Sequence, residues 1–433
     1  MRKKLLYLLL VLAGIYSCKK ESDPVFDKSP DERLNDTLQQ YQQILTHAPY
    51  GWKAMVYPGG SPKSVYSFYF RFNDSNRVRM YSDFEQSSTV TAKESSWRLK
   101  ALQQPSLLFD TYSYLHVLCD PDAGQNGGGF GKGLGSDFEF SINGMTGDTM
   151  VLTGRFNRSR AILVKATQQE QADYYQQHIN RNIDSVRKIL TYFHRLTVGN
   201  TRYDVEVNTL THRITFTWVV GGQVKTATTG YYYTSKGIAL SPAFTDGTNT
   251  ISSFDDVKFE DGAVKGTING QPASISETVK PLAMDIAAPK RWYQAALSLR
   301  RYWVAAEGFH VNGVDDAYGL KTLPDFLEAT FWPEAGGPGS GIDAFGIIVP
   351  EEGQPTLMYG VIHTAPTFTS DGRAIFHDTR LFGDLPPDVT PLLRTRALMA
   401  DQTGFFLVQT SAYTYDMVSA KDGKSWITWI LPR

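Results

Sequence analysis

Hydrophobic positions along this chain follow two different periods in alternation. Leu34, Leu38, Tyr41 and Leu45 recur at spacings of four, three and four residues. This spacing predicts a helix with one buried face, which Ser29 or Asp31 can cap. After this helix the apolar period changes to two, which is typical of half-buried strands.

Short β-branched or aromatic segments follow, separated by Gly, Asn, Asp and Pro. Such segments with polar turns between them predict consecutive antiparallel strands, and therefore a sheet or a barrel-like meander. The predicted strands of this first block are 65–72, 77–84, 95–102, 112–118, 137–142, 149–156 and 161–166.

The same order then begins again with a predicted helix over 168–196, whose apolar stripe includes Ile183, Val186 and Ile189. The two blocks end alike, since DFEFSINGMTGDTMVLTG in the first corresponds to DDVKFEDGAVKGTING in the second, each a strand, a Gly-containing turn and a strand. We interpret this as a loose structural duplication. The predicted strands of the second block are 202–207, 213–220, 228–234, 237–241, 253–260 and 263–268.

A third block opens with the apolar-periodic stretch RWYQAALSLRRYWVAA and closes with two or more strands. The predicted fold class is α+β, mostly antiparallel β, with repeated units of a helix followed by a β-meander in a barrel-like or curved sheet. The predicted segments are a signal peptide at 1–17, a tether at 18–30, two helix-plus-meander domains at 31–167 and 168–280, and a C-terminal α+β domain at 281–433.

The N-terminal segment MRKKLLYLLLVLAGIYSC has three cationic residues, an eleven-residue apolar run and a small residue directly before Cys18. This is the pattern of a bacterial lipoprotein signal, in which the cysteine is acylated and becomes the new N-terminus. Eleven helical residues reach only about 16 Å, roughly half of a bilayer core. We therefore predict a lipid anchor at Cys18 and not a membrane-spanning helix; a plain secretory peptide is the alternative.

Charge and cysteine content narrow the function classes further. Removal of residues 1–17 leaves 40 Lys and Arg against 44 Asp and Glu, a formal charge of −4. No basic cluster is large enough to suggest nucleic acid as a partner. With Cys18 acylated, Cys119 is left alone, so no intramolecular disulfide is expected and its default role is a buried, inert thiol.

The Gly-rich loop DPDAGQNGGGFGKGLGS has the most unusual composition in the chain. It lacks the spacing of a phosphate-binding loop and leads into a strand. Asp120, Asp122 and Asn126 offer oxygens at alternating positions, but Gly124 and Gly131 occupy two positions where a calcium loop needs ligands. We therefore expect a mobile hairpin or binding loop that contributes little to a core, with calcium as a weak alternative and otherwise no cofactor or metal.

Aromatic residues make up 13% of the chain, including eight Trp. Aromatic faces suit sugar rings or extended peptides, although most of those in strands are expected to be core. Trp332, beside a Gly/Pro-rich loop, is the best candidate for an exposed platform. No catalytic residue can be named, because HExxH and GxSxG are absent from the sequence, and neighbouring carboxylates such as Asp255-Asp256 and Asp315-Asp316 usually point apart or are solvated in turns.

The run FDKSPDERLNDTLQQYQQILTHAPYGWKAMVYPGG, followed by SFYFRFNDSNRVRMYSDF and PSLLFDTYSYLHVLCDPD, resembles an uncharacterised lipoprotein family of Bacteroidota. The resemblance covers roughly residues 25–280. Members of this domain-of-unknown-function family resemble accessory proteins of SusC/SusD-type outer-membrane nutrient importers. The resemblance implies an outer-membrane location and nutrient capture, and it carries over no catalytic residue.

Two functional hypotheses follow. The first is a non-catalytic outer-membrane lipoprotein, accessory to the capture of a glycan or peptide nutrient by a SusC/SusD-type importer. The alternative is a secreted hydrolase whose active site is not recognisable from the sequence. The segment KKESD after Cys18 only partly resembles the acidic signals for surface display. Display at the cell surface is therefore favoured, and the periplasmic face remains the alternative.

Overall fold

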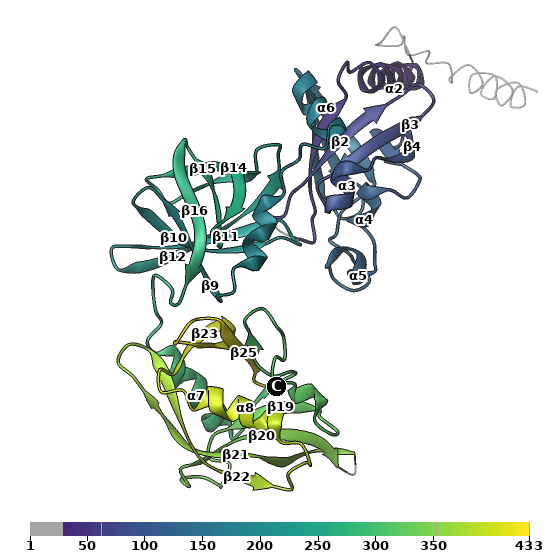
Figure 1. The fold of residues 1–433 in the computed structure, drawn as a ribbon. Helices are drawn as coiled ribbons and strands as arrows, with labels where there is room; N and C mark the ends of the chain where they lie inside the picture. The colour runs from purple at the N-terminus through teal and green to yellow at the C-terminus, as the bar shows by residue number, and fades with distance from the viewer. Residues whose placement is uncertain (1–28, 62, 352, 433) are drawn as a thin grey trace, which may run out of the picture. The chain divides into compact units, whose positions relative to one another are not determined.

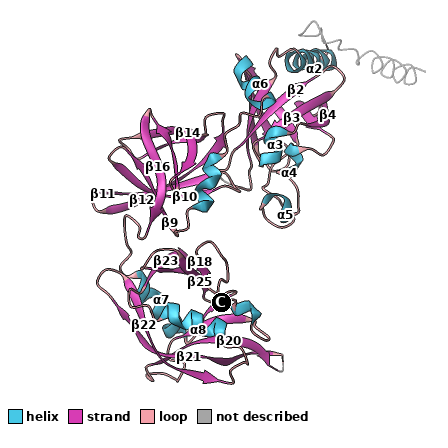
Figure 2. Ribbon diagram, viewed as in Figure 1, coloured by secondary structure: helices cyan, strands magenta, loops and turns pink. Residues whose placement is uncertain are grey.

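The computed structural model describes residues 29–61, 63–351 and 353–432, and antiparallel β-strands dominate it (Figures 1 and 2). Two closed barrels are followed by a nine-stranded sheet. This architecture confirms the predicted fold class. Within the described ranges, no helix combines the length and apolarity needed to cross a membrane. The predicted lipidation residue Cys18 lies outside the described residues.

The chain separates into two compact units. The first contains residues up to 60, with 68–81 and 91–171. The second contains 61–67, 82–90 and everything from 172 onward. Two short segments of the first barrel, which include the ends of two of its strands, therefore belong to the second unit.

Helix α2 (Pro30–Thr46) begins as its sequence predicts. The Glu32 backbone N–H donates to the Ser29 hydroxyl at 3.2 Å, and the Ser29 N–H donates to the Glu32 carboxylate at 2.8 Å. This reciprocal capping box satisfies two N–H groups that the first helical turn leaves unpaired. Of the two predicted caps, Ser29 is the one used.

The first barrel closes by antiparallel pairing of its first strand with its eighth, with Trp52 opposite Lys165 and Tyr57 opposite Arg160. Three short helices, α3 (Gln86–Val90), α4 (Tyr114–Val117) and α5 (Ala123–Asn126), interrupt the meander. Its strands are β1 (Trp52–Tyr57), β2 (Tyr66–Phe72), β3 (Arg77–Ser82), β4 (Lys93–Ala101), β5 (Pro105–Phe109), β6 (Glu139–Thr146), β7 (Thr149–Gly154) and β8 (Arg160–Lys165).

Aromatic side chains fill the interior of this barrel. Phe70 lies 5.6 Å from both Phe68 and Phe109 between ring centroids, and Phe72 meets Trp97 edge-on at 5.0 Å. All five are at most 2% exposed. An eight-stranded barrel is just wide enough for side chains to fill it, so this interior is a packed core. The strand aromatics are core residues, as expected.

The predicted strand at 112–118 is wrong, because this segment contains the short helix α4. Leu115 and Leu118 are both buried, three residues apart, which is a helical spacing and not a strand spacing. The Ser113 N–H donates to His116 Nδ1 at 3.2 Å, and this side-chain acceptor completes the helical turn.

The second barrel repeats this plan after α6 (Gln168–Tyr175) and the 3₁₀ helix η1 (Asn182–Lys188). Its first strand pairs with its last, with Val198 opposite Ala273 and Phe193 opposite Thr278. Its strands are β9 (Phe193–Val198), β10 (Thr201–Asn208), β11 (Arg213–Val220), β12 (Gln223–Tyr233), β13 (Ile238–Thr245), β14 (Thr250–Glu260), β15 (Ala263–Ile268) and β16 (Gln271–Thr278).

The predicted continuous helix over 168–196 is therefore wrong as well. Gln177 adopts a left-handed backbone conformation with a φ of 61°, which ends α6. Ile183, Val186 and Ile189 are buried at intervals of three, the period of the 3₁₀ helix and its immediate end. The apolar stripe was correctly recognised, but it belongs to a shorter and tighter element.

The duplicated hairpin occupies equivalent positions in the two barrels. DFEFSINGMTGDTMVLTG forms β6 and β7, and DDVKFEDGAVKGTING forms most of β14 and β15. These are the sixth and seventh strands of their respective barrels. The structural duplication inferred from the sequence therefore extends to strand order.

The C-terminal sheet curves around helix α7 (Ala288–Leu299), whose Trp292 is fully buried against Trp303 and Phe331. Val304 pairs with Ile430, so the first and last strands of this domain in chain order also meet. The other elements are β17 (Trp303–Ala305), β18 (His310–Val311), η2 (Leu320–Thr322), β19 (Glu328–Trp332), β20 (Ile342–Glu351), β21 (Gln354–Phe368), β22 (Arg373–Gly383), α8 (Thr390–Met399), β23 (Phe405–Ser411), β24 (Thr414–Ser419) and β25 (Ser425–Ile430).

A fully buried carboxyl group organises part of the second unit. Asp83 accepts hydrogen bonds from the Ser67 N–H at 2.8 Å and the Tyr233 N–H at 3.0 Å. His212, also fully buried, places Nδ1 3.9 Å from the Asp83 carboxylate and 3.2 Å from the Val65 carbonyl. These contacts join three segments that are distant in sequence.

Burial raises the pKa of Asp83 to about 7. Burial, together with the Arg181 guanidinium, lowers the pKa of His212 to about 3. In mildly acidic solution the folded pair therefore holds its one proton on Asp83, while the unfolded pair holds its proton on the histidine. Because the number of bound protons is the same in both states, the pair adds no pH dependence to stability between pH about 4 and 6.5.

In Asp83→Asn, His212 is the one member of the pair that still titrates, so its contribution to the pH dependence of stability should become measurable. A lowered folded pKa means that the stability contributed by His212 is present above pH 6.5 and is lost as the pH falls. We expect the variant to lose about 3 kcal/mol of unfolding free energy, relative to the parent, between pH 6.5 and 4. Urea denaturation at a series of pH values measures this difference.

The control variant His212→Asn should show the opposite slope. The raised pKa of Asp83 then makes stability fall as the pH rises from about 4 to 7. Profiles of both variants that run parallel to that of the parent would show that the two groups are not coupled to folding in this way.

Candidate functional site

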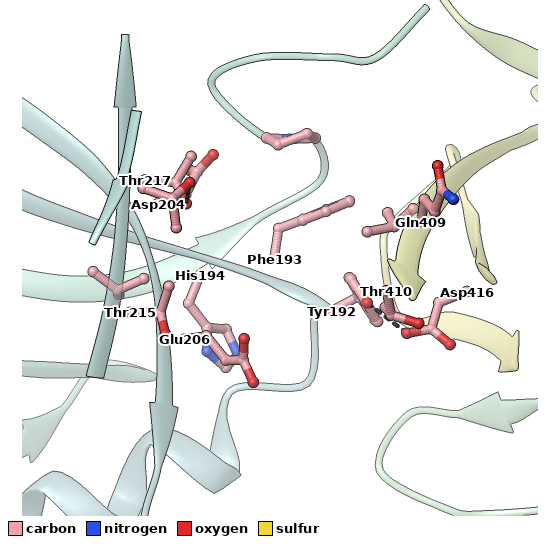
Figure 3. Close-up of a pocket in the computed structure, with 14 residues that line it drawn as sticks. Tyr192, Phe193, His194, Asp204, Glu206, Thr215, Thr217, Gln409, Thr410 and Asp416 are labelled. Atoms are coloured by element: carbon pink, nitrogen blue, oxygen red, sulfur yellow. Dashed lines mark hydrogen bonds between the residues drawn. The ribbon is translucent and has the colours of Figure 1, made fainter. Parts of the chain in front are cut away.

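A groove of about 710 Å³ lies within the second unit (Figure 3). One wall is the outer face of the second barrel, at β10, β11 and β12, and the other is formed by β23 and β24 of the C-terminal sheet. Tyr192 and Phe193 lie at its base, just where β9 begins. We call this feature the groove.

Strand register decides which side chains form the barrel wall. Asp204 is opposite Thr217, and Thr217 is opposite Thr226, so these three side chains share one face. Their sequence neighbours Val205 and Phe216 point into the barrel and are buried. The wall is therefore polar because the apolar members of each strand fill the core.

Threonine hydroxyls form a two-strand row along this wall. The hydroxyl oxygens of Thr215 and Thr228 are 2.9 Å apart, and those of Thr217 and Thr226 are 3.4 Å apart. Each hydroxyl can donate one hydrogen bond and accept two. A pair that shares one proton still has acceptor sites for a ligand, so the row can bind donors and acceptors alike.

Two carboxylates in the groove are already engaged. Asp204 accepts from Arg195 Nε at 2.6 Å and from the Leu282 N–H at 2.5 Å. Asp416, on the opposite wall, accepts from the Tyr192 hydroxyl at 2.6 Å and from the Thr428 hydroxyl at 2.7 Å. These bonds hold both carboxylates in fixed positions.

Glu206 differs, because it forms no hydrogen bond or ion pair with the described residues and is exposed on the wall opposite Thr215. Burial raises the pKa of Tyr192 well above its ordinary value, and the negative charges of Asp416 and Glu206 raise it further. Burial lowers the pKa of His194, which is therefore neutral at physiological pH. No Lys or Arg is among the residues that line the groove, although Arg195 pairs with Asp204 and Arg291 donates to Gln409 at 3.2 Å.

An aromatic ring completes the site. Figure 3 shows Phe193 between the threonine wall and Gln409. Tyr192 packs edge-on against it at 5.0 Å and against Trp426 at 5.5 Å. The groove thus combines hydroxyls, carboxylates and one ring face, which can bind a neutral polar ligand through hydrogen bonds and stacking.

The sequence-predicted loop residues do not converge on a shared ligand position. Asp120 accepts from the Tyr112 hydroxyl at 2.5 Å and from the Asp122 N–H at 2.9 Å. Asp122 caps α5 by accepting from the Gly124 N–H at 2.9 Å. No group of three acidic, histidine or cysteine side chains that could hold a metal occurs among the described residues.

Asn126 is fully buried, and its side-chain amide donates to the Val117 and Asp120 carbonyls at 2.7 and 2.9 Å and accepts from the Gly128 N–H at 2.8 Å. Leu134 at the other end of the loop is 2% exposed, whereas Phe130 at the tip is 92% exposed. The expectation that this loop contributes little to a core is therefore wrong. The hydrogen bonds of the buried Asn126 amide, and not a cluster of apolar side chains, anchor most of this loop.

The structure places Trp332 at the end of β19, half-buried, with its ring 5.1 Å from that of Tyr302. It lies outside the groove, in a separate pocket. Cys119 is a free thiol whose pKa burial raises to about 12, which agrees with an inert role.

Sequence reasoning missed the groove. The signal available was the alternation of threonine in ITFT and again in TATT, at Thr215, Thr217, Thr226 and Thr228. Polar residues at a period of two indicate an exposed strand face. They do not indicate which other segment faces them.

These elements define a protein of two closed antiparallel barrels and a curved sheet, with a polar groove. The chain belongs to the family described as a domain of unknown function, DUF4302, whose model matches residues 22–259. No curated protein matches the chain.

Solved structures give only remote likeness. A DNA polymerase III beta subunit from Thermotoga maritima is 10% identical, with a TM-score of 0.13 over 92% of this chain and 97% of that one. The isotype 1 transferrin binding protein B of Neisseria meningitidis is 7% identical, with a TM-score of 0.14 over 88% of this chain and 73% of that one. TM-scores this low do not indicate a shared overall fold or function.

Asn126→Ala should destabilise the first unit. The change removes three hydrogen bonds and leaves the Asp120 carbonyl without a donor and the Gly128 N–H without an acceptor, which costs about 2–3 kcal/mol. The matched control Phe130→Ser, at the exposed tip, should leave stability unchanged. Urea unfolding of both variants measures the effect, and equal stability of the two would show that the loop is not packed.

Proposed function

We propose that this protein is a non-catalytic, lipid-anchored binding protein of the outer membrane that captures a neutral glycan in the groove. It would act as an accessory to a SusC/SusD-type nutrient importer. The single observation that carries the glycan proposal is the threonine row facing Phe193 and Asp416 in a groove without Lys or Arg.

The chemistry of the wall favours a sugar polymer over a peptide. Backbone groups of the closed barrel are paired with one another, so a peptide cannot add to this wall as an extra strand. Only side chains are offered, and hydroxyls and carboxylates match the donors and acceptors of sugar hydroxyls. Phe193 supplies an apolar face for the C–H side of a sugar ring.

The state of the carboxylates favours binding over hydrolysis. Glycoside hydrolysis needs one carboxyl group as acid and a second as base or nucleophile. Asp204 and Asp416 each accept two hydrogen bonds from protein donors, which fix the two carboxylates in place. Glu206 is then the one carboxylate of the groove with no described partner, and no second carboxyl group there is set up as an acid.

Location and partner rest on the sequence. The signal pattern before Cys18 supports lipid anchoring, and the family resemblance supports the outer membrane, with the cell surface favoured. An accessory role beside an importer is consistent with a binding groove that releases its ligand unchanged.

Thr217→Val combined with Thr226→Val should weaken binding of a neutral oligosaccharide about tenfold or more, because each lost hydroxyl removes about 1 kcal/mol of hydrogen bonding. Isothermal titration calorimetry with a panel of neutral hexose oligomers and polar peptides measures this. Thr267→Val, on the outer face of β15 and outside the groove, is the matched control.

Two outcomes would contradict the proposal. Equal affinity of the groove variant and the control for every oligosaccharide that binds would place the glycan site elsewhere. Release of shorter oligomers from the parent, and its loss in Glu206→Gln, would favour the hydrolase alternative.

Cys18→Ala should abolish acylation, because the thiol that carries the lipid is gone. We expect the unprocessed variant to lack the mass of the acyl groups by intact-mass spectrometry and to be released from washed membranes more readily than the parent. Cys119→Ala should remain anchored, since that thiol is internal. An unchanged mass and membrane fraction for Cys18→Ala would disprove the lipoprotein assignment.

A further inference from the structure

A second cavity, of about 300 Å³, lies beside the C-terminal sheet at the end of α7. Leu297 and Arg300 form one side, and Trp332, Pro333 and Pro338 form the other. Its volume is at the lower end of the range for ligand sites, about 300–1,000 Å³, and suits a single ring. None of its lining residues belongs to the groove.

Trp332 provides an aromatic wall whose position is restricted. Its ring packs at 46° against that of Tyr302, with 5.1 Å between centroids, and the side chain is half-buried. Pro333 and Pro338 add rigid apolar surface beside it. An indole held in this way can stack on the C–H face of a sugar ring with little loss of entropy.

Arg300 is exposed and brings a positive charge to the cavity. It ends α7 in a left-handed conformation, with a φ of 52°, and its backbone N–H caps the Leu297 carbonyl. Among the described residues no acidic side chain forms an ion pair with Arg300. Glu334 lines the same cavity, but its carboxylate accepts from the Gly339 N–H at 2.9 Å within its own loop.

Hydrogen bonds to the buried Asp343 carboxyl group fix the loop opposite Arg300. Glu334 has a left-handed φ of 51°, and its N–H donates to Asp343 at 2.8 Å. The same Asp343 oxygen accepts from the Tyr293 hydroxyl at 3.0 Å, and Asp343 is fully buried. A left-handed conformation is unfavourable for a non-glycine residue, so the buried carboxyl group stabilises an otherwise unfavourable loop shape. The cavity wall is therefore preorganised.

We propose that this cavity binds an acidic sugar unit, a pyranose ring that carries a carboxylate. The ring stacks on Trp332, and its carboxylate pairs with the planar guanidinium of Arg300, which can donate two parallel hydrogen bonds. The groove has no Lys or Arg among its lining residues, and the nearby Arg195 and Arg291 are already paired with Asp204 and Asp285, so it cannot bind such a unit in this way. The two sites therefore take sugars of different charge, and this inference does not depend on the function proposed for the groove.

The test compares glucuronate with glucuronamide, in which an amide replaces the carboxylate of the same ring. Ligand-detected NMR titration of the mature full chain should show saturable glucuronate binding and at least tenfold weaker binding of glucuronamide, because the charge-assisted pair is lost. Arg300→Gln should reduce glucuronate affinity to that of glucuronamide and leave glucuronamide unaffected. Arg394→Gln, an exposed arginine on α8 with the same charge change, is the control and should bind as the parent does.

The aromatic wall is tested separately. Trp332→Ala should abolish binding of both ligands, and Trp332→Phe should retain part of it, with folding of each variant checked by thermal unfolding. The proposal is overturned if glucuronate shows no saturable binding at millimolar concentrations, if the two ligands bind equally, or if folded Arg300→Gln keeps the affinity of the parent. Binding of neutral oligosaccharides in the groove should not change in any of these variants, so failure here is distinguishable from failure of the groove.

Discussion

Pairing between the first and eighth strands is the constraint on which both barrels depend. β1 pairs with β8 over six residues, and β9 pairs with β16 over six residues. Closure removes the free strand edges that would otherwise invite association with other chains. It also divides each strand into an inner and an outer face, so one set of side chains becomes core and the other becomes wall. The groove exists because the wall residues of β10, β11 and β12 are polar.

The aromatic interior follows from the same constraint. A closed eight-stranded barrel has a narrow interior, which Phe68, Phe70, Phe72 and Trp97 fill in the first barrel. In the second barrel, Phe216 stacks on Phe244 at 4.0 Å and Tyr203 meets Phe244 edge-on. The high aromatic content of the chain therefore serves packing first. Of the aromatic residues that line the two proposed sites, Phe193 and Trp332 are the ones proposed to stack on a sugar ring.

Local rules succeeded where spacing and chemistry agreed. The helix at Pro30–Thr46 has a capping box and one apolar stripe, and both are readable from neighbouring residues. Local rules failed where an apolar run was compatible with both the helical and the strand period. The segment around Leu115 is rich in strand-forming residues, yet burial of Leu115 and Leu118 on the same side selects a helical turn. The sequence suggests Asn126 as a possible ligand. Its burial is not predictable locally, because it depends on hydrogen bonds to the carbonyls of Val117 and Asp120, which are not its immediate neighbours in sequence.

The sequence by itself determined the fold class, the repeated order of elements and the packing of strand aromatics, because these depend on periodicity within about ten residues. Tertiary structure alone decided the sites. Tyr192 and Asp416 are joined by a hydrogen bond across more than two hundred residues, and Asp83 meets Tyr233 across 150. No local pattern encodes such pairs, since barrel register and the folding of the C-terminal sheet bring them together. For the same reason Arg300 and Trp332 look unremarkable in sequence and become a charged, aromatic cavity only once α7 and β19 are placed side by side.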